Sequence, residues 1–378
     1  MSWLEWAREE TDGVRAQGRW RAPRDFDASG PEGKLAPDGR PVVSFASNDY
    51  LGLTQHPAVV AAAHAALDRW GAGSGSARLI VGSRPVHSEL EDALASWKGT
   101  ERAALFPTGF ATNLGVLTTF GGPGVLVCSD ELNHASIIDG CRLSRAEVAV
   151  YRHADAHDLA RVLDTAGGRR CVVVSDTVFS MDGDVAPLDD LADVCRQHRA
   201  LLVLDEAHAV LGPHPPAGGF PGVDTIRIGT LSKTLGALGG FVAAATPFVD
   251  LVVNRARPYI FTTASTPADA AAALAALGVV RSGEGDTLVA RLRAHVERLR
   301  PGHPSPIVPV VCGEERRALD ASAALLERGL LVPAIRPPTV APGTSRLRVA
   351  LSAAHTSAQV DELAVALHEL GLGLGDAG

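Results

Sequence analysis

The sequence is poor in features that mark several broad classes of protein. Aromatic residues make up only 5% of its 378 residues, and the net charge is −8, with no block of basic residues. A surface that stacks nucleic-acid bases or follows a phosphate backbone is therefore not expected. Long apolar runs are also absent, since the longest, 236–253, is interrupted by glycines, Pro247 and Asp250. That run predicts a buried strand, a turn and the start of a helix, not a membrane span.

Cysteines are few and show no pairing pattern. There are five, an odd number, and no two of them form a C-x-x-C pair. We expect neither a disulfide framework nor a metal site. The first 19 residues are charged and contain no apolar stretch of the kind a secretory signal needs. These observations favour a protein of the reducing cytoplasm.

The composition that is present is that of a folded globular protein. Hydrophobic residues account for 46% and charged residues for 21% of the chain, which allows a large core. Short apolar runs predict strands at 102–106, 124–128, 147–151, 171–175, 201–205, 226–230 and 240–245. Helical patterns lie between most of them, near 87–98, 110–120, 135–144, 155–165 and 188–198. This alternation is typical of a mostly parallel sheet covered by helices on both faces.

Two changes in composition divide the chain. Residues 1–46 are polar and Arg-rich, and they predict an N-terminal arm with a short helix followed by a loop over 28–41. Near residue 280 the pattern changes to a charged helix at 284–300, and then to strand, helix, two strands and helix over 307–370. We expect an α/β fold with a large domain at 47–280 and a smaller C-terminal α+β domain at 281–378.

Residues able to do chemistry follow three of the expected strands. In open α/β sheets, ligands bind beyond the carboxyl ends of the strands. The residues found there are Ser180 after 171–175, Asp205 and His208 after 201–205, and Lys233 after 226–230.

Lys233 and Asp205 are the strongest of these candidates. Lys233 follows an apolar strand and precedes a segment rich in glycine and alanine. Crowding and partial desolvation there lower the pKa of an amine and make it a better nucleophile. Asp205 needs a partner, because a lone buried charge is costly. Taken singly, however, each residue has a plainer interpretation: a capping or salt-bridged Asp205, and a solvated surface Lys233.

Two weaker signals complete the pattern. Gly109, in TGFATN, permits a tight turn before a helix whose free N–H groups bind phosphate well. His134, in DELNHAS, follows a strand and starts a helix, although a single histidine in such a place more often has a structural role. A lysine for an aldehyde, a carboxylate for a pyridinium nitrogen and a phosphate cup are together what pyridoxal phosphate (PLP) requires.

Eight motifs extend the pattern over essentially the whole chain. They are SNDYLGL (47–53), GAGSGSARLIVGS (71–83), HSELE (87–91), FPTGFATN (106–113), DELNHASIIDG (130–140), VFSMDGD (178–184), LDEAH (204–208) and GTLSK (229–233). In content and order they resemble the α-oxoamine synthases, which are PLP-dependent transferases of fold type I.

The resemblance implies a role for each residue around the cofactor ring. Lys233 would bind the cofactor covalently and later move the substrate proton. Asp205 would pair with the pyridinium nitrogen, and His134 would stack on the ring. His208 and Ser180 would hydrogen-bond the phenolic oxygen.

It also implies phosphate and substrate contacts. The phosphate would be held by Gly109, Phe110, Thr230 and Ser232. Thr262 and Thr263 would reach the phosphate of the partner subunit, so a homodimer with shared sites is expected. Arg336 would hold the amino-acid carboxylate, with Arg348 as the next candidate, and further substrate contacts would come from Arg21, Asn48 and Thr339.

The reaction implied by the resemblance is a decarboxylative condensation of an amino acid with an acyl thioester. The opening MSW and the segment 334–356 favour members that use L-alanine with pimeloyl-CoA or a pimeloyl carrier thioester. The alternatives are a sister synthase that uses glycine, a non-catalytic protein of the same fold, and a purely structural role for the strand-end residues.

The chain departs from the family pattern after His208. The sequence HAVLGPHPPAGGF replaces a Gly-rich loop, with Leu211 where the family usually has glycine and two adjacent prolines that stiffen the segment. Asp176 also stands where glutamate is usual. The cofactor residues are unaffected, but the changed loop leaves the shape of its surroundings, and part of the substrate preference, open.

Overall fold

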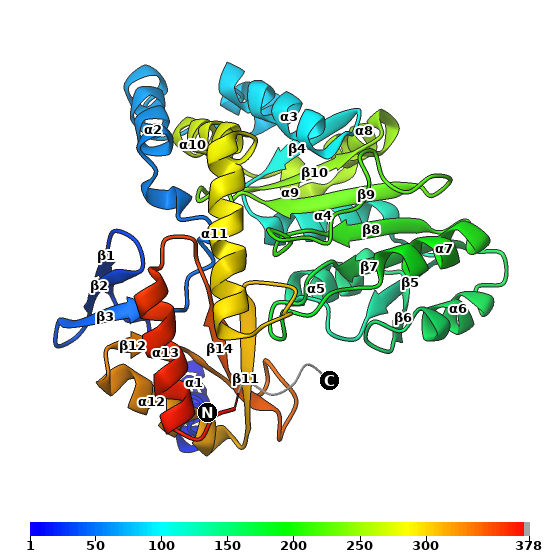
Figure 1. Cartoon of the computed structure of the whole chain (residues 1–378). Helices are drawn as coiled ribbons and strands as arrows, with labels where there is room; N and C mark the ends of the chain where they lie inside the picture. Colours follow the sequence, from blue (N-terminus) through cyan, green and yellow to red (C-terminus); the bar gives the residue numbers. More distant parts are fainter. Residues whose placement is uncertain (374–378) are drawn as a thin grey trace.

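The computed structural model describes residues 1–373 and divides into two parts. Figure 1 shows a large domain built on one central sheet and a smaller domain below it, which also holds the N-terminal end of the chain. The long helix α11 (Gly283–Leu299) runs along the boundary between them. The predicted C-terminal domain extends to residue 378, and its last five residues lie outside the described part.

The central sheet has seven strands in the order β4-β10-β9-β8-β7-β5-β6. Their bounds are β4 Arg102–Phe106, β5 Val125–Asp130, β6 Glu147–Tyr151, β7 Arg170–Asp176, β8 Leu201–Asp205, β9 Thr225–Thr230 and β10 Gly240–Ala244. Strands β6, β5, β7, β8 and β9 are parallel, and only β10 runs antiparallel to its two neighbours. The expected α/β fold with a mostly parallel sheet is therefore confirmed.

Helices cover both faces of this sheet, as the apolar strands predict. One face packs against α4 (Gly109–Phe120), α5 (Ala135–Ser144), α8 (Thr246–Arg255) and α9 (Arg257–Ile260). The other packs against α3 (Pro85–Lys98), α6 (Ala156–Asp164), α7 (Leu188–His198) and α10 (Pro267–Val280). Three shorter or peripheral helices complete this part of the chain: α2 (Pro57–Trp70), η1 (Leu53–Gln55) and η2 (Arg78–Gly82).

The small domain contains a three-stranded sheet in the order β11-β14-β13. Its strands are β11 (Ile307–Gly313), β13 (Ala334–Ile335) and β14 (Ser345–Ala350), and α12 (Glu315–Glu327) and α13 (Ser357–Glu369) accompany them. A further strand, β12 (Leu330–Leu331), pairs with β3 (Arg40–Ser44) from the N-terminal part of the chain. The C-terminal region thus has one strand more than the sequence pattern predicts.

The loop predicted over 28–41 is wrong, because this segment forms a hairpin. Strands β2 (Glu32–Leu35) and β3 pair antiparallel, and β1 (Phe26–Ala28) adds to β2. The turn uses Gly39 at a φ of +69°, and the Asp38 side chain accepts a hydrogen bond from the Arg40 backbone N–H at 3.2 Å. Residues 28–41 are so rich in the glycine, proline and aspartate typical of turns that their sequence does not reveal the short strands.

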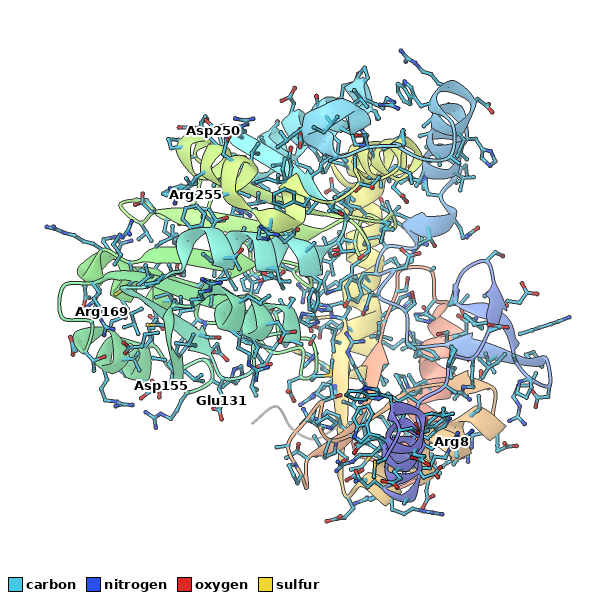
Figure 2. All side chains as sticks on the ribbon, turned by 180° about the vertical axis from the view of Figure 1, so that it is seen from behind. Arg8, Glu131, Asp155, Arg169, Asp250 and Arg255 are labelled. Atoms are coloured by element: carbon cyan, nitrogen blue, oxygen red, sulfur yellow. The ribbon has the colours of Figure 1, made fainter. Side chains whose placement is uncertain are left out.

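The N-terminal helix α1 (Trp3–Ala16) lies beside the small domain. Figure 2 shows the same division from behind, with Arg8 of α1 at one end of the molecule and Asp250 and Arg255 of α8 at the other. Among the described residues, 1–373, no helix has the length and apolar character needed to cross a bilayer.

Candidate active site

Three neighbouring parallel strands bring the predicted residues together. In the sheet, β8 lies between β7 and β9, and Asp176 of β7 is the register partner of Asp205 of β8. His208 follows β8 and Lys233 follows β9, so all four residues reach the carboxyl edge of the sheet. This is the edge at which open α/β sheets bind ligands.

Lys233 lies at one end of a hydrogen-bonded chain. Its Nζ is 2.7 Å from Nε2 of His208, and Nδ1 of His208 is 2.6 Å from the Tyr50 hydroxyl. That hydroxyl also donates to Asn48 Oδ1 at 3.1 Å. With Lys233 donating to Nε2, the proton of a neutral His208 lies on Nδ1 and is donated to Tyr50.

Burial sets the protonation of this chain. It lowers the pKa of Lys233 below its ordinary value, although the carboxylates of Asp205 and Asp176 oppose the shift. Burial and the nearby Lys233 charge lower the pKa of His208 well below its ordinary value, so His208 is neutral. Burial also raises the pKa of Tyr50 to about 12. His208 and Tyr50 are therefore uncharged donors and acceptors at neutral pH, and the Lys233 amine is easier to deprotonate than an exposed lysine.

Asp205 is held by two donors. Its Oδ2 accepts from Asn113 Nδ2 at 2.7 Å, and its Oδ1 accepts from the Ala207 backbone N–H at 2.9 Å. Asp205 and Asn113 are both buried. A buried carboxylate with two fixed donors and an open side is suited to pair with a cationic ring nitrogen.

His134 caps α5 and is connected to the same network. Its Nδ1 lies 2.7 Å from the Ser136 hydroxyl and accepts from the Ser136 backbone N–H at 3.3 Å, while Asn113 Nδ2 donates to that hydroxyl at 2.9 Å. Because the Ser136 N–H donates to Nδ1, the ring proton lies on Nε2, the nitrogen left free to meet a ligand. Burial lowers the pKa of His134, which favours this neutral form.

Asp176 fixes the backbone at the start of α5. Its Oδ2 accepts from the His134 N–H at 2.8 Å, and its own N–H donates to Asn133 Oδ1 at 2.8 Å. Burial and the charge of Asp205 raise the pKa of Asp176 well above its ordinary value. Although aspartate is shorter than the glutamate usual at this position, the Asp176 carboxylate still reaches the backbone N–H of His134 at the start of α5.

The predicted phosphate residues lie together on the other side of Lys233. Helix α4 begins at Gly109, and the N–H groups of Gly109 and Phe110 have no partner inside the helix. A Cβ on Gly109 would come within 3.3 Å of Thr230 Cβ, so the absence of a side chain keeps the two segments close. The Thr230 and Ser232 hydroxyls are 2.8 Å apart.

Arg348 joins the cluster and links it to the small domain. From β14 its Nε donates to the Ser180 carbonyl at 2.5 Å and its Nη2 donates to Asn48 Oδ1 at 3.1 Å. Arg348 thus holds Ser180 and Asn48, two of the predicted site residues, against each other.

Other predicted residues are placed elsewhere. Arg336 donates to the Gly18 carbonyl at 3.1 Å and pairs with Glu315 at 3.6 Å. Arg21 and Thr339 are exposed, and Thr339 lines a cavity of about 950 Å³ together with Phe179 and Met181. The roles proposed for these three residues stay predictions.

Thr262 and Thr263 lie beside a small cavity that is also lined by Phe106 and Pro107. Thr263 forms a backbone bridge with Ala77, beside the η2 turn. Leu79, Ile80, Val81 and Phe261 nearby are exposed apolar residues. The contact expected between these threonines and the phosphate of a partner subunit stays a prediction.

The donor set fits PLP on the geometry of this structure. Lys233 offers an amine of lowered pKa, Asp205 a buried carboxylate, and the Gly109 turn a cradle that a Cβ would narrow against Thr230. Free N–H groups and two hydroxyls at that cradle are phosphate donors.

The comparisons agree with this geometry. The family of class I and II aminotransferases matches residues 40–367. An 8-amino-7-oxononanoate synthase of Anaeromyxobacter dehalogenans (strain 2CP-1) is 50% identical, over 96% of this chain and 95% of the relative. One from Methylobacterium sp. (strain 4-46) is 47% identical, over 92% of this chain and 94% of the relative. The chain belongs to the 8-amino-7-oxononanoate synthase family. It is therefore a PLP-dependent acyltransferase of fold type I.

Solved structures of the family superimpose over most of the chain. A serine palmitoyltransferase from S. paucimobilis with a bound PLP–myriocin adduct has a TM-score of 0.90 and 30% identity, covering 98% of this chain and all of that one. The 8-amino-7-oxononanoate synthase of Francisella tularensis has a TM-score of 0.72 and 25% identity, covering 87% of this chain and 98% of that one.

Sequence reasoning missed several members of the network. Asn113, Ser136 and Tyr50 all lie inside motifs that were recognised, but none was assigned a role. Asn113 is four residues after Gly109, which places it one helical turn further along α4 and facing the sheet. That spacing could have identified Asn113 as a site residue. The contact between Tyr50 and His208 spans 158 residues of sequence, so no local pattern could have revealed it.

Proposed function

We propose that the chain condenses L-alanine with a pimeloyl thioester, carried by CoA or by a carrier protein, to give 8-amino-7-oxononanoate and CO₂ in biotin synthesis. The observation that supports a reaction of this class is the convergence of Lys233, His208 and Asp205 at adjacent strand ends. The names of the relatives and the segment 334–356 support the choice of substrates.

When bound at Lys233, PLP would supply an electron sink for the Cα of the amino acid. Lys233 Nζ, with its lowered pKa, removes the Cα proton. Asp205 holds a proton on the ring nitrogen, and Asn113 keeps the carboxylate in place. His134 presents Nε2–H to the substrate, and Arg336 receives its carboxylate.

Carbon–carbon bond formation is the next step, and each bond that forms is matched by one that breaks. A bond forms between Cα and the thioester carbonyl, the C–S bond breaks, and the thiol leaves. The carboxyl group of the amino acid departs as CO₂, and a proton from Lys233 is returned to Cα. The cavity at Thr339 is lined by Phe179, Met181 and Pro337 together with polar residues such as Asp182 and Arg346, and its volume is large enough to hold a short aliphatic acyl chain.

We also propose that the active unit is a cytoplasmic homodimer. The exposed Leu79, Ile80, Val81 and Phe261 surround the segment that carries Thr262 and Thr263. Burying this apolar surface against a second copy would place both threonines in the partner's phosphate site. Sedimentation of the holoenzyme tests this: activity in a monomer at assay concentration would contradict it.

The experiment that tests the reaction is mass spectrometry of the products. Purified holoenzyme is given L-alanine, glycine or L-serine, each with pimeloyl-CoA, acetyl-CoA or palmitoyl-CoA. The proposal predicts 8-amino-7-oxononanoate from alanine and pimeloyl-CoA as the preferred product. Faster turnover of glycine with acetyl-CoA, or of serine with palmitoyl-CoA, would assign the chain to a sister activity.

A further inference from the structure

A second cavity lies behind the candidate active site, on the α3 side of the sheet. Its volume is about 360 Å³, and its walls come from α3, β9, β10, α11 and the loop 209–217. This loop is the segment in which the chain departs from the family pattern. The cavity adjoins the active site, because Ala207, Thr230 and Thr234 line it while Asp205 and Lys233 do not.

Three buried charged side chains stand at this cavity. Arg227 binds Glu206 through two nitrogens, one of them Nη2 at 2.9 Å from Oε2, and also donates to the Lys98 carbonyl at 2.9 Å. Lys98 Nζ donates to the same Oε2 at 2.7 Å. The side chains of Lys98, Glu206 and Arg227 are 6%, 1% and 5% exposed.

Counting these charges leaves one positive charge uncompensated. Arg227 and Glu206 neutralise each other in a two-pronged pair, and the only other ionisable residue lining the cavity is His214. Burial and the two cations lower the pKa of His214, so its imidazole stays neutral and does not offset the excess positive charge. Burial lowers the pKa of Lys98 as well, while Glu206 opposes that shift. An excess cation in such a place is costly unless an anion accompanies it.

Lys98 also has a hydrogen-bonding position to spare. One N–H goes to Glu206, and the ammonium stands 3.9 Å from the centroid of the Trp97 ring. Within residues 1–373 the structure gives Lys98 Nζ no second hydrogen-bond acceptor. The remaining lining is largely apolar and includes Trp97, Leu235, Phe241 and Val289.

We propose that this cavity is a second binding site, for a small aliphatic monocarboxylate. The carboxylate accepts from Lys98 and neutralises the excess charge, and the alkyl chain packs on Trp97, Leu235 and Phe241. Ala207 and Thr234 in the cavity wall follow Asp205 and Lys233 closely in sequence, so the site lies next to the catalytic segments. The inference is independent of the substrates proposed above.

The test is calorimetric titration of the PLP-loaded enzyme with sodium hexanoate. Acetate, hexan-1-ol and hexylamine are the matched probes for chain and charge. We expect saturable binding of hexanoate that is tighter than the binding of acetate, hexan-1-ol or hexylamine. Absence of saturable hexanoate binding, or binding of hexylamine or acetate as tight as that of hexanoate, would overturn the proposal.

Two variants locate the site. Lys98→Met removes the excess charge and leaves the Glu206–Arg227 pair intact, so hexanoate binding is expected to weaken about tenfold or more. Val289→Phe fills the cavity from α11 without changing charge and should weaken it as well. Lys34→Met, on the exposed β2 strand, is the control and should bind as the unmodified enzyme does.

These variants also distinguish the cavity from the active site. Circular dichroism and the visible absorption of the bound cofactor show whether each variant is folded and loaded. If folded, loaded Val289→Phe and Lys98→Met both bind hexanoate with unchanged affinity, the carboxylate binds elsewhere and the proposal fails. If either variant does not fold, the other decides the outcome.

Discussion

Asn113 Nδ2 lies 2.7 Å from Asp205 Oδ2 and 2.9 Å from the Ser136 hydroxyl. One amide group on α4 therefore connects the carboxylate on β8 with the serine that orients His134 on α5. In the described part of the chain no hydrogen bond joins Asp205 to His134 directly, and Asn113 connects the two through Ser136.

Replacing Asn113 with alanine is expected to lower kcat/KM about 10- to 100-fold, because Asp205 loses a charge-assisted hydrogen bond. PLP should still bind, since the Lys233 and phosphate contacts remain. The pH dependence of kcat should change, because the hydrogen bonds that orient Asp205 and, through Ser136, His134 are lost. A merely structural role would leave the pH profile unchanged. Asn254→Ala, at an exposed position on α8, is the control.

Asp205→Asn should retain part of its PLP and lose most of its activity. A neutral amide does not hold a proton on the ring nitrogen, and the lost contact is worth roughly 1.5–3 kcal/mol in cofactor binding. The loss in rate should be larger, since charge develops on the ring mainly in the transition state. Steady-state kinetics at saturating PLP provide the measurement. Near-normal turnover would show that Asp205 only maintains the fold.

Arg336→Lys should weaken alanine binding by about 1–3 kcal/mol, because a lysine keeps the charge but loses the two-pronged contact to a carboxylate. Arg336→Ala should be weaker still, with the affinity for the thioester unchanged. In the structure Arg336 contacts Gly18 and Glu315, so alanine must displace or add to these contacts. Alanine titrations followed by the visible absorption of the cofactor measure the effect. Unchanged affinity in both variants would transfer the role to Arg348.

His153 should make the fold more stable at neutral than at alkaline pH. Burial opposes its charge, but hydrogen bonds to Asp130 at 3.0 Å and Asp184 at 2.6 Å raise the pKa of His153 to about 10. Since the unfolded value is about 6.5, the native state binds more protons between these two values. The stabilisation is complete below about pH 6.5 and is lost as the pH rises through about 10.

Urea unfolding of the unmodified protein and of His153→Gln measures this contribution. The difference in unfolding free energy should be largest near pH 6 and disappear above pH 10. His157→Gln, on the exposed side of α6, should show no such trend. A difference that grows with pH would contradict the assignment.

The sequence predicted the strand ends of the large domain well because the chemistry there is local. An apolar strand followed by Asp205 or Lys233 is visible within ten residues, and the fold brings these ends to one edge of the sheet. The polar network between the strand ends was not predictable in the same way. The contact of Arg348 with Asn48 joins residues 300 positions apart, and no local pattern encodes it.

The N-terminal hairpin was not predicted from the sequence, for a related reason. Strands β2 and β3 are short, and β12, the partner of β3, is two residues long and lies nearly 300 residues away in sequence. Their identity as strands therefore comes from pairing and not from an apolar alternation that a sequence could reveal.

Borohydride reduction of the PLP-loaded enzyme, followed by peptide mapping, tests the central claim most directly. The chain has three lysines, Lys34, Lys98 and Lys233, so the assignment is unambiguous. Lys34 is exposed, and Lys98 is held by Glu206 in the second cavity. We predict that the reduced cofactor is found on the peptide that contains Lys233. Its recovery on Lys98 or Lys34, with Lys233 unmodified, would contradict the account.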